Sequence, residues 1–205
     1  MNLAYLEAAM AGDRDDWFVA CSLRAELEAA RLSPAALARV LELGVPAGLL
    51  GQLCGAGDIG AGRVALSADG ARFEPEGPDP RLLLGVREQG VLVDLVALAT
   101  HDPDQWALRW GQGWCLGYDA WLACETGRAH ELRLFATPLA WLRAGGVGIV
   151  ILDWDEGLRC LRGLGEHVLL RCDRGAGERL RKLLSIGNLP RVKETGPVVP
   201  VRRAA

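Results

Sequence analysis

Apolar positions change their spacing along the chain and divide it into three regions. Over residues 1–55 they recur every three or four positions, which is typical of amphipathic helices. Over residues 56–125 they form short runs between glycine-containing turns, the pattern of an antiparallel sheet. Over residues 126–195 apolar runs alternate with amphipathic stretches, which predicts a mostly parallel sheet with connecting helices. Residues 196–205 have no periodicity and are expected to form a flexible tail.

This order of elements predicts an α/β protein, α+β overall, with N-terminal helices, a central antiparallel sheet and a C-terminal strand–helix section. The helical part carries its own start and stop signals. Ser33 and Pro34 suit the N-cap and first-turn positions of a helix that Gly44 ends, and a short helix begins at Pro46.

Helix, turn and helix is also the outline of a DNA-binding motif. In the second helix, residues 46–54, Gln52 is the one side chain suited to reading a base edge. The favoured interpretation is therefore a helical hairpin that covers a sheet.

Two hairpins are expected in the middle of the chain. Residues 63–67 and 71–74 are joined by Ala-Asp-Gly, and residues 82–86 and 91–98 are joined by Glu-Gln-Gly. The glycine-rich stretch 55–62 lacks the GxxxxGK[ST] pattern of a phosphate-binding loop and is expected to be a flexible link.

An apolar stretch, residues 147–152, is expected to be a central strand with parallel neighbours, because neither of its faces suits water. Asp153 and Asp155 follow it, at the end of the strand where ligands bind in open α/β sheets. Two carboxylates there can hold Mg²⁺. In the structural alternative, Asp155 caps the following helix and Asp153 accepts hydrogen bonds from loop amides.

The order of strand, Asp-x-Asp, small residue and helix resembles the second motif of the toprim fold of primases, topoisomerases and related nucleases. In that family an upstream strand ends in a catalytic glutamate followed by glycine. The corresponding stretch here is LRLFATPLAWLRAGG, in which Ala136 or Thr137 stands in place of the glutamate. The resemblance spans residues 80–185, because LLLGVREQGVLVDLVAL is similar to the segment preceding the toprim part of phage and plasmid primases. It implies a degenerate toprim-like domain, over residues 126–195, that lacks the acid for proton transfer.

The stretch ATPLAWLRAGGVGIVILDW is also similar to proteins of alphaproteobacterial mobile elements. That resemblance implies a mobile-element setting and no particular activity.

An aromatic stretch, WALRWGQGWCLGYDAW, is the second candidate site. Strand alternation places Trp106 and Trp110 on one face, with Arg109 opposite. Aromatic rings beside arginine can stack the bases of single strands, at about 1–3 kcal/mol per base. Packing in the core is the alternative role for these rings.

The most basic stretch, RCDRGAGERLRK, is the third candidate site. Its glycines open a helix whose backbone amides could receive a phosphate. The candidate nucleic-acid-binding side chains here are Arg174, Arg179, Arg181 and Lys182. A solvated helix face is the structural alternative.

Composition narrows the class of protein. The net charge is −3, so no global positive field favours nucleic acid or an anionic membrane. No apolar run approaches the roughly 18 residues of a membrane-spanning helix, and residues 1–10 do not resemble a signal peptide. The six cysteines form no CxxC pair, which favours reduced thiols over disulfides or a zinc site. We therefore expect a cytoplasmic protein without a membrane partner.

The leading hypothesis is a non-catalytic accessory protein of a mobile element or prophage that binds single-stranded nucleic acid or a replication protein. One alternative is a Mg²⁺-dependent nuclease or primase-related enzyme that uses Asp153 and Asp155. The other is a structural protein–protein interaction module. No GxSxG motif occurs, so no nucleophilic catalytic residue is predicted.

Overall fold

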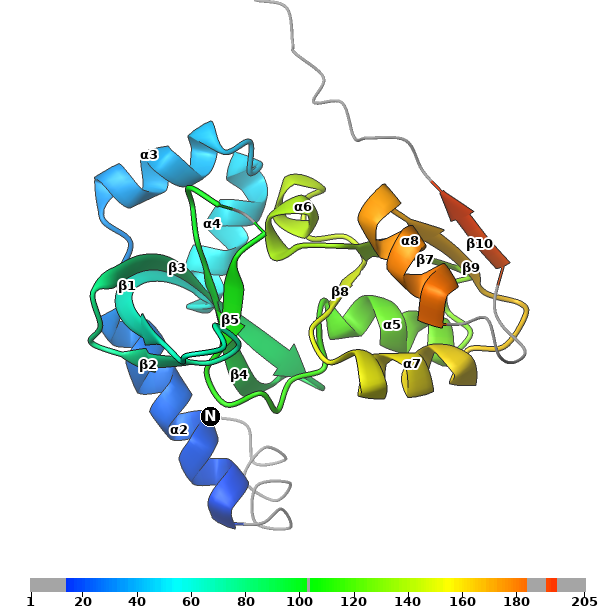
Figure 1. The fold of residues 1–205 in the computed structure, drawn as a ribbon, viewed down its shortest axis with the longest axis horizontal. Coiled ribbons are helices and arrows are strands. Elements are labelled where there is room, and N and C mark those ends of the chain that lie inside the picture. Colours follow the sequence, from blue (N-terminus) through cyan, green and yellow to red (C-terminus); the bar gives the residue numbers. More distant parts are fainter. Residues whose placement is uncertain (1–13, 103, 184–190, 195–205) are drawn as a thin grey trace, which may run out of the picture.

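The computed structural model describes residues 14–102, 104–183 and 191–194 and contains two five-stranded sheets that lie side by side (Figure 1). The first sheet has the strand order β2-β1-β3-β4-β5, and its strand pairings are antiparallel. Its strands are β1 (Ile59–Leu66), β2 (Phe73–Pro75), β3 (Asp79–Glu88), β4 (Val91–Leu98) and β5 (Trp106–Leu108). The predicted α/β class with a central antiparallel sheet is confirmed.

The second sheet has the strand order β10-β9-β7-β8-β6. Strands β10, β9, β7 and β8 run parallel, and β6 pairs antiparallel with β8. Its strands are β6 (Cys115–Leu116), β7 (Glu131–Phe135), β8 (Ile149–Ile151), β9 (Leu169–Cys172) and β10 (Arg191–Glu194). The connecting helices are α5 (Tyr118–Glu125), α6 (Pro138–Arg143), α7 (Trp154–Gly163) and α8 (Arg174–Leu183).

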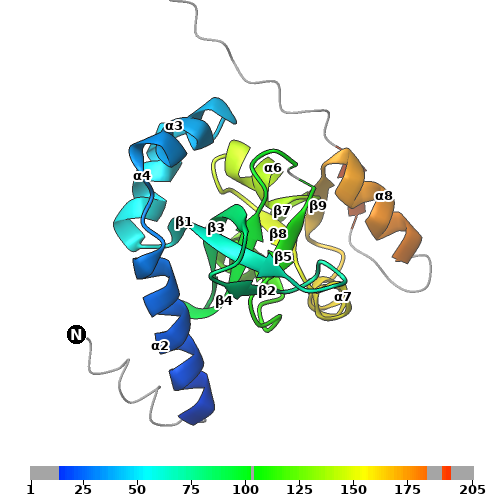
Figure 2. The same cartoon turned by 60° about the vertical axis from the view of Figure 1, so that its left-hand side comes forward.

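Three helices flank the first sheet: α2 (Arg14–Ala29), α3 (Pro34–Glu42) and α4 (Ala47–Ala56) (Figure 2). The Ser33 hydroxyl caps α3 by accepting a hydrogen bond from the Ala36 N–H at 3.1 Å, as expected. Val40 of α3 and Leu50 of α4 are buried in a core cluster that also contains side chains of β3 and α6. The α3–α4 hairpin therefore covers the core, in agreement with the favoured interpretation.

The glycine-rich stretch 55–62 is not the flexible link that was expected, because it ends α4 and begins β1. A Cβ atom on Gly60 would lie 2.3 Å from the carbonyl oxygen of Ala30, and the Ala61 N–H donates to that oxygen at 2.7 Å. Glycine is needed here for the close approach of two backbone segments.

The prediction for residues 147–152 is partly wrong. Strand β8 is buried, but it has β7 as a parallel neighbour on one side and the antiparallel β6 on the other, so β7 is the middle strand. Val147 lies before the strand and is 58% exposed. The loop between β5 and β6 leads the chain from the first sheet to the edge of the second, where β6 pairs with β8, and local periodicity does not reveal this pairing.

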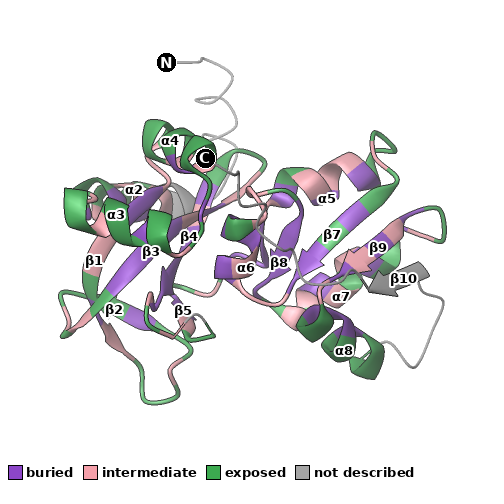
Figure 3. Cartoon of the chain, turned by 90° about the horizontal axis from the view of Figure 1, so that it is seen from above, coloured by how far each residue is buried: buried purple, intermediate pink, exposed green. Residues whose placement is uncertain are grey.

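The second sheet begins before the predicted boundary at residue 126, because β6 and α5 pack with it. One core cluster joins the two sheets and contains Leu84 and Val86 of β3 with Leu116 of β6 and Val150 of β8. Figure 3 shows that β3, β4 and β8 are largely buried. The predicted tail, residues 196–205, lies outside the described residues. Of the helices in the described part of the chain, none has the length and apolar character to cross a bilayer.

We predict that Ile151→Asp lowers the free energy of unfolding by about 3 kcal/mol or more, because it buries a carboxylate without a partner. Ile151 is 3% exposed and its side chain packs on Gly157. Val147→Asp, on the same segment, is the matched control and changes stability by less than about 0.5 kcal/mol. Urea unfolding of both variants tests the placement of β8, and equal losses of stability contradict it.

Candidate functional site

A cavity of about 330 Å³ opens where the carboxyl end of β8 faces the first sheet. The first sheet contributes Arg72, which precedes β2, and Gly111, in the loop after β5. The second sheet contributes residues at the start of α7 and on α8, namely Asp153, Trp154, Asp155 and Arg179. The structure therefore brings together the predicted Asp-x-Asp pair and one arginine of the predicted basic helix.

Asp153 is the N-cap of α7. Its Oδ1 atom accepts hydrogen bonds from the N–H groups of Asp155 at 2.9 Å and Glu156 at 3.3 Å. The expected roles are thus exchanged, because Asp155 lies in the first turn of the helix and does not cap it. One oxygen of the Asp153 carboxylate is occupied by the cap, which leaves fewer lone pairs for a cation.

The carboxylates offer a metal ion few ligands. Within the described ranges, no group of three or more His, Cys, Asp or Glu side chains is placed to hold a metal ion. Ala136 and Thr137 stand where the toprim resemblance requires glutamate, and Thr137 caps α6 by accepting from the Ala140 N–H at 3.2 Å. Asp153 and Asp155 could hold Mg²⁺ only together with oxygens from water or a bound phosphate.

Two arginines give the cavity its positive groups. The guanidinium carbon of Arg179 lies 4.5 Å from the ring centroid of Trp154, a cation–π arrangement that orients both planes. The Arg72 guanidinium occupies the space beside Gly111, where a Cβ atom would lie 1.8 Å from Nη2. Gly111 has a φ of 76°, so both its conformation and its lack of a side chain suit this position.

The rest of the predicted basic helix lies outside the lining of this cavity. Arg174 pairs with Glu178 at 3.3 Å on the exposed surface, and Arg181 and Lys182 are in the last turn of α8. The N-terminus of α8 is not a free phosphate site, which corrects the prediction. The Asp173 carboxylate accepts hydrogen bonds from the N–H groups of Ala136 and Ala176, both at 2.8 Å, and its charge repels phosphate.

The aromatic stretch is arranged differently from the prediction. Strand β5 ends at Leu108, so alternation stops before Trp110. The guanidinium carbon of Arg109 lies 4.4 Å from the Trp110 ring centroid instead of on the opposite face, and its Nε atom pairs with Glu26 at 3.1 Å. Trp106 packs against the core cluster that joins the two sheets, whereas Trp110 is exposed. The two rings therefore do not form one stacking face.

No disulfide joins the six cysteines, all of which lie in the described part of the chain, and three of them are buried. Burial and the carboxylate of Glu156 raise the pKa of Cys160 to about 11. Burial also raises the pKa of Cys115 well above its ordinary value. These two side chains are therefore protonated at neutral pH and unsuited to nucleophilic catalysis.

Sequence reasoning missed Arg72 and the role of Trp154. Trp154 lies inside the Asp-x-Asp motif, so its position beside the carboxylates was visible in the sequence. Arg72 carries no motif, and its place in the cavity depends on how the two sheets meet.

Comparison with protein-family models, with curated proteins and with solved structures found no match to this chain. The described residues form a two-sheet α/β protein with a polar, partly aromatic cavity where the carboxyl end of β8 faces the first sheet.

We predict that Asp153→Ala lowers the free energy of unfolding by about 1 kcal/mol, because α7 loses its cap. Asp153→Asn keeps the cap and changes stability by only a few tenths of a kcal/mol. Asp155→Ala is the matched control, since it removes the same charge without removing the cap. Urea unfolding separates the three variants, and a loss for Asp155→Ala equal to that for Asp153→Ala would contradict the assignment.

Proposed function

We propose that this chain is a non-catalytic accessory protein that binds single-stranded nucleic acid by taking one nucleotide into the cavity beside α7. The observation that carries the proposal is the stack of Arg179 on Trp154 in a cavity that Arg72 also lines. The resemblance to phage and plasmid primases supports a role in the replication of a mobile element.

Each part of a nucleotide has a chemical partner in this cavity. An indole or guanidinium plane stacks a base of any identity. Arginine binds phosphate with paired hydrogen bonds, which is the role we assign to Arg72. The carboxylates of Asp153 and Asp155 can accept hydrogen bonds from base amino groups. A volume of about 330 Å³ lies within the range of small-molecule sites.

The charge of the protein limits the strength of this binding. The chain carries a net charge of −3, so long-range attraction to nucleic acid is absent. Affinity then depends on one or two phosphate contacts, each of which contributes a slope of about −0.7 in the dependence of log affinity on log salt. Single strands are preferred to duplexes, because a stacked and paired base cannot enter the cavity.

We predict that a labelled single strand binds at low salt and that Arg179→Gln weakens this binding about tenfold. Arg162→Gln is the matched control, because Arg162 is an exposed arginine of α7 that does not line the cavity. Arg174→Gln serves the same purpose on α8. Fluorescence anisotropy titrations of the four proteins, with a duplex of the same sequence, measure the effect.

Absence of binding at low salt, where charges are least screened, would contradict the proposal. Equal weakening by Arg162→Gln would indicate non-specific attraction. If no binding occurs at low salt, a protein–protein interaction module becomes the favoured function. Leu37 and Leu41 lie one turn apart on α3, are 37% and 41% exposed, and could contact a partner protein.

The second candidate function is a Mg²⁺-dependent nuclease or primase-related enzyme, which the placement of Asp153 and Asp155 at the cavity favours. No described acid or histidine accompanies them as a metal-binding group, so we expect no cleavage or synthesis when DNA is incubated with Mg²⁺ or Mn²⁺. Activity that is lost in the Asp153→Asn variant, whose cap is intact, would establish the enzyme instead.

A further inference from the structure

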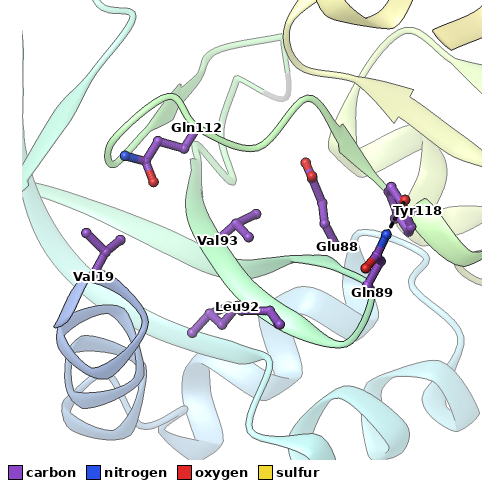
Figure 4. A pocket seen from close by; sticks show the side chains of 8 residues that line it. Val19, Glu88, Gln89, Leu92, Val93, Gln112 and Tyr118 are labelled. Carbon is purple, nitrogen blue, oxygen red and sulfur yellow. Dashed lines mark hydrogen bonds between the residues drawn. The ribbon is translucent and has the colours of Figure 1, made fainter. Parts of the chain in front are cut away.

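A second cavity, of about 450 Å³, is lined in part by Gln112, which follows Gly111 in the loop after β5 (Figure 4). Five segments line it: α2, the end of β3 with the turn that follows it, the start of β4, the loop after β5, and α5. Its polar groups belong to Glu88, Gln89, Gln112 and Tyr118. The valine and leucine side chains of α2 and β4 form the apolar part, as Figure 4 shows for Val19, Leu92 and Val93.

We propose that this cavity binds a small organic ammonium ion, an amine with an aliphatic or aromatic body. The site shares no lining residue with the cavity beside α7 and does not depend on the proposed function.

The carboxylate of Glu88 is suited to bind a positively charged ligand. Its Oε1 atom accepts one hydrogen bond, from the Trp114 N–H at 3.1 Å. None of the described residues that line the cavity is basic. Arg87, the neighbouring residue, is held by Asp58 with Nη2–Oδ1 and Nε–Oδ1 distances of 2.6 and 2.8 Å. Burial, with the nearby charge of Glu156, raises the pKa of Glu88, as expected for a half-buried carboxylate that has no counter-ion among the described residues.

The other side chains that line this cavity favour an organic cation over a metal ion. A metal ion needs several oxygen or nitrogen ligands, and one carboxylate supplies too few. The apolar wall suits the hydrocarbon part of an amine, and the ring of Tyr118 can attract its ammonium group. The Tyr118 hydroxyl and the Gln89 side-chain amide, 3.5 Å apart, add hydrogen-bonding groups at the same end of the cavity.

The test uses phenethylamine with 2-phenylethanol as its uncharged analogue, observed through the backbone amide resonances of the whole protein. We predict that the amine binds with a dissociation constant on the order of millimolar and shifts the amides of residues 91–93. The alcohol is expected to bind at least about tenfold more weakly.

Glu88→Gln is predicted to abolish the preference for the amine, while its side-chain oxygen still accepts from Trp114. Asp119→Asn is the matched control, because Asp119 is an exposed acid beside Tyr118 that does not line the cavity, and it retains the preference. Equal binding of amine and alcohol to the unaltered protein overturns the proposal, even if Glu88→Gln fails to fold. So does an undiminished preference in a folded Glu88→Gln variant, or the absence of shifts at residues 91–93.

Discussion

The arrangement of the two sheets depends on the hydrogen bonds that one fully buried carboxylate accepts, that of Asp94 in β4. It accepts backbone hydrogen bonds from Trp110 at 2.9 Å, Gly111 at 2.5 Å and Gln112 at 2.8 Å, in the loop that leaves the first sheet. A buried carboxylate is costly unless such donors replace its water, and once they do it holds them in one geometry. Asp94 therefore sets the path of the chain from β5 to β6.

Both cavities depend on this path. Gly111 lines the cavity beside α7, and Gln112 lines the cavity that contains Glu88. Two residues later, the Trp114 carbonyl accepts hydrogen bonds from the N–H groups of Leu152 and Asp153 at 2.7 and 3.1 Å, which positions the Asp-x-Asp motif. The same loop thus connects a carboxylate in the first sheet to the carboxyl end of β8 in the second.

Local signals predicted much of the fold and part of the site. The cap at Ser33 and the position of Asp153 after an apolar strand depend on neighbours in sequence, and both were identified correctly. Gly60 was misinterpreted because its role is set by a backbone segment about thirty residues away, which periodicity cannot reveal. Arg72 was missed for the same reason. Asp94 carried one visible signal, since it is a single acid within the apolar strand β4, and such a residue requires buried partners.

Amide hydrogen exchange in the Asp94→Asn variant is the most direct test of whether the Asp94 carboxylate holds the loop between β5 and β6 in place. The asparagine amide group would face backbone donors in place of an acceptor oxygen, so at least one of the loop N–H groups loses its partner. We predict that protection of the amides of residues 110–112 falls about a hundredfold relative to the unaltered protein. Amides of α8, far from Asp94 in the chain, serve as the internal reference. Unchanged protection of residues 110–112 in a folded Asp94→Asn variant would contradict the account.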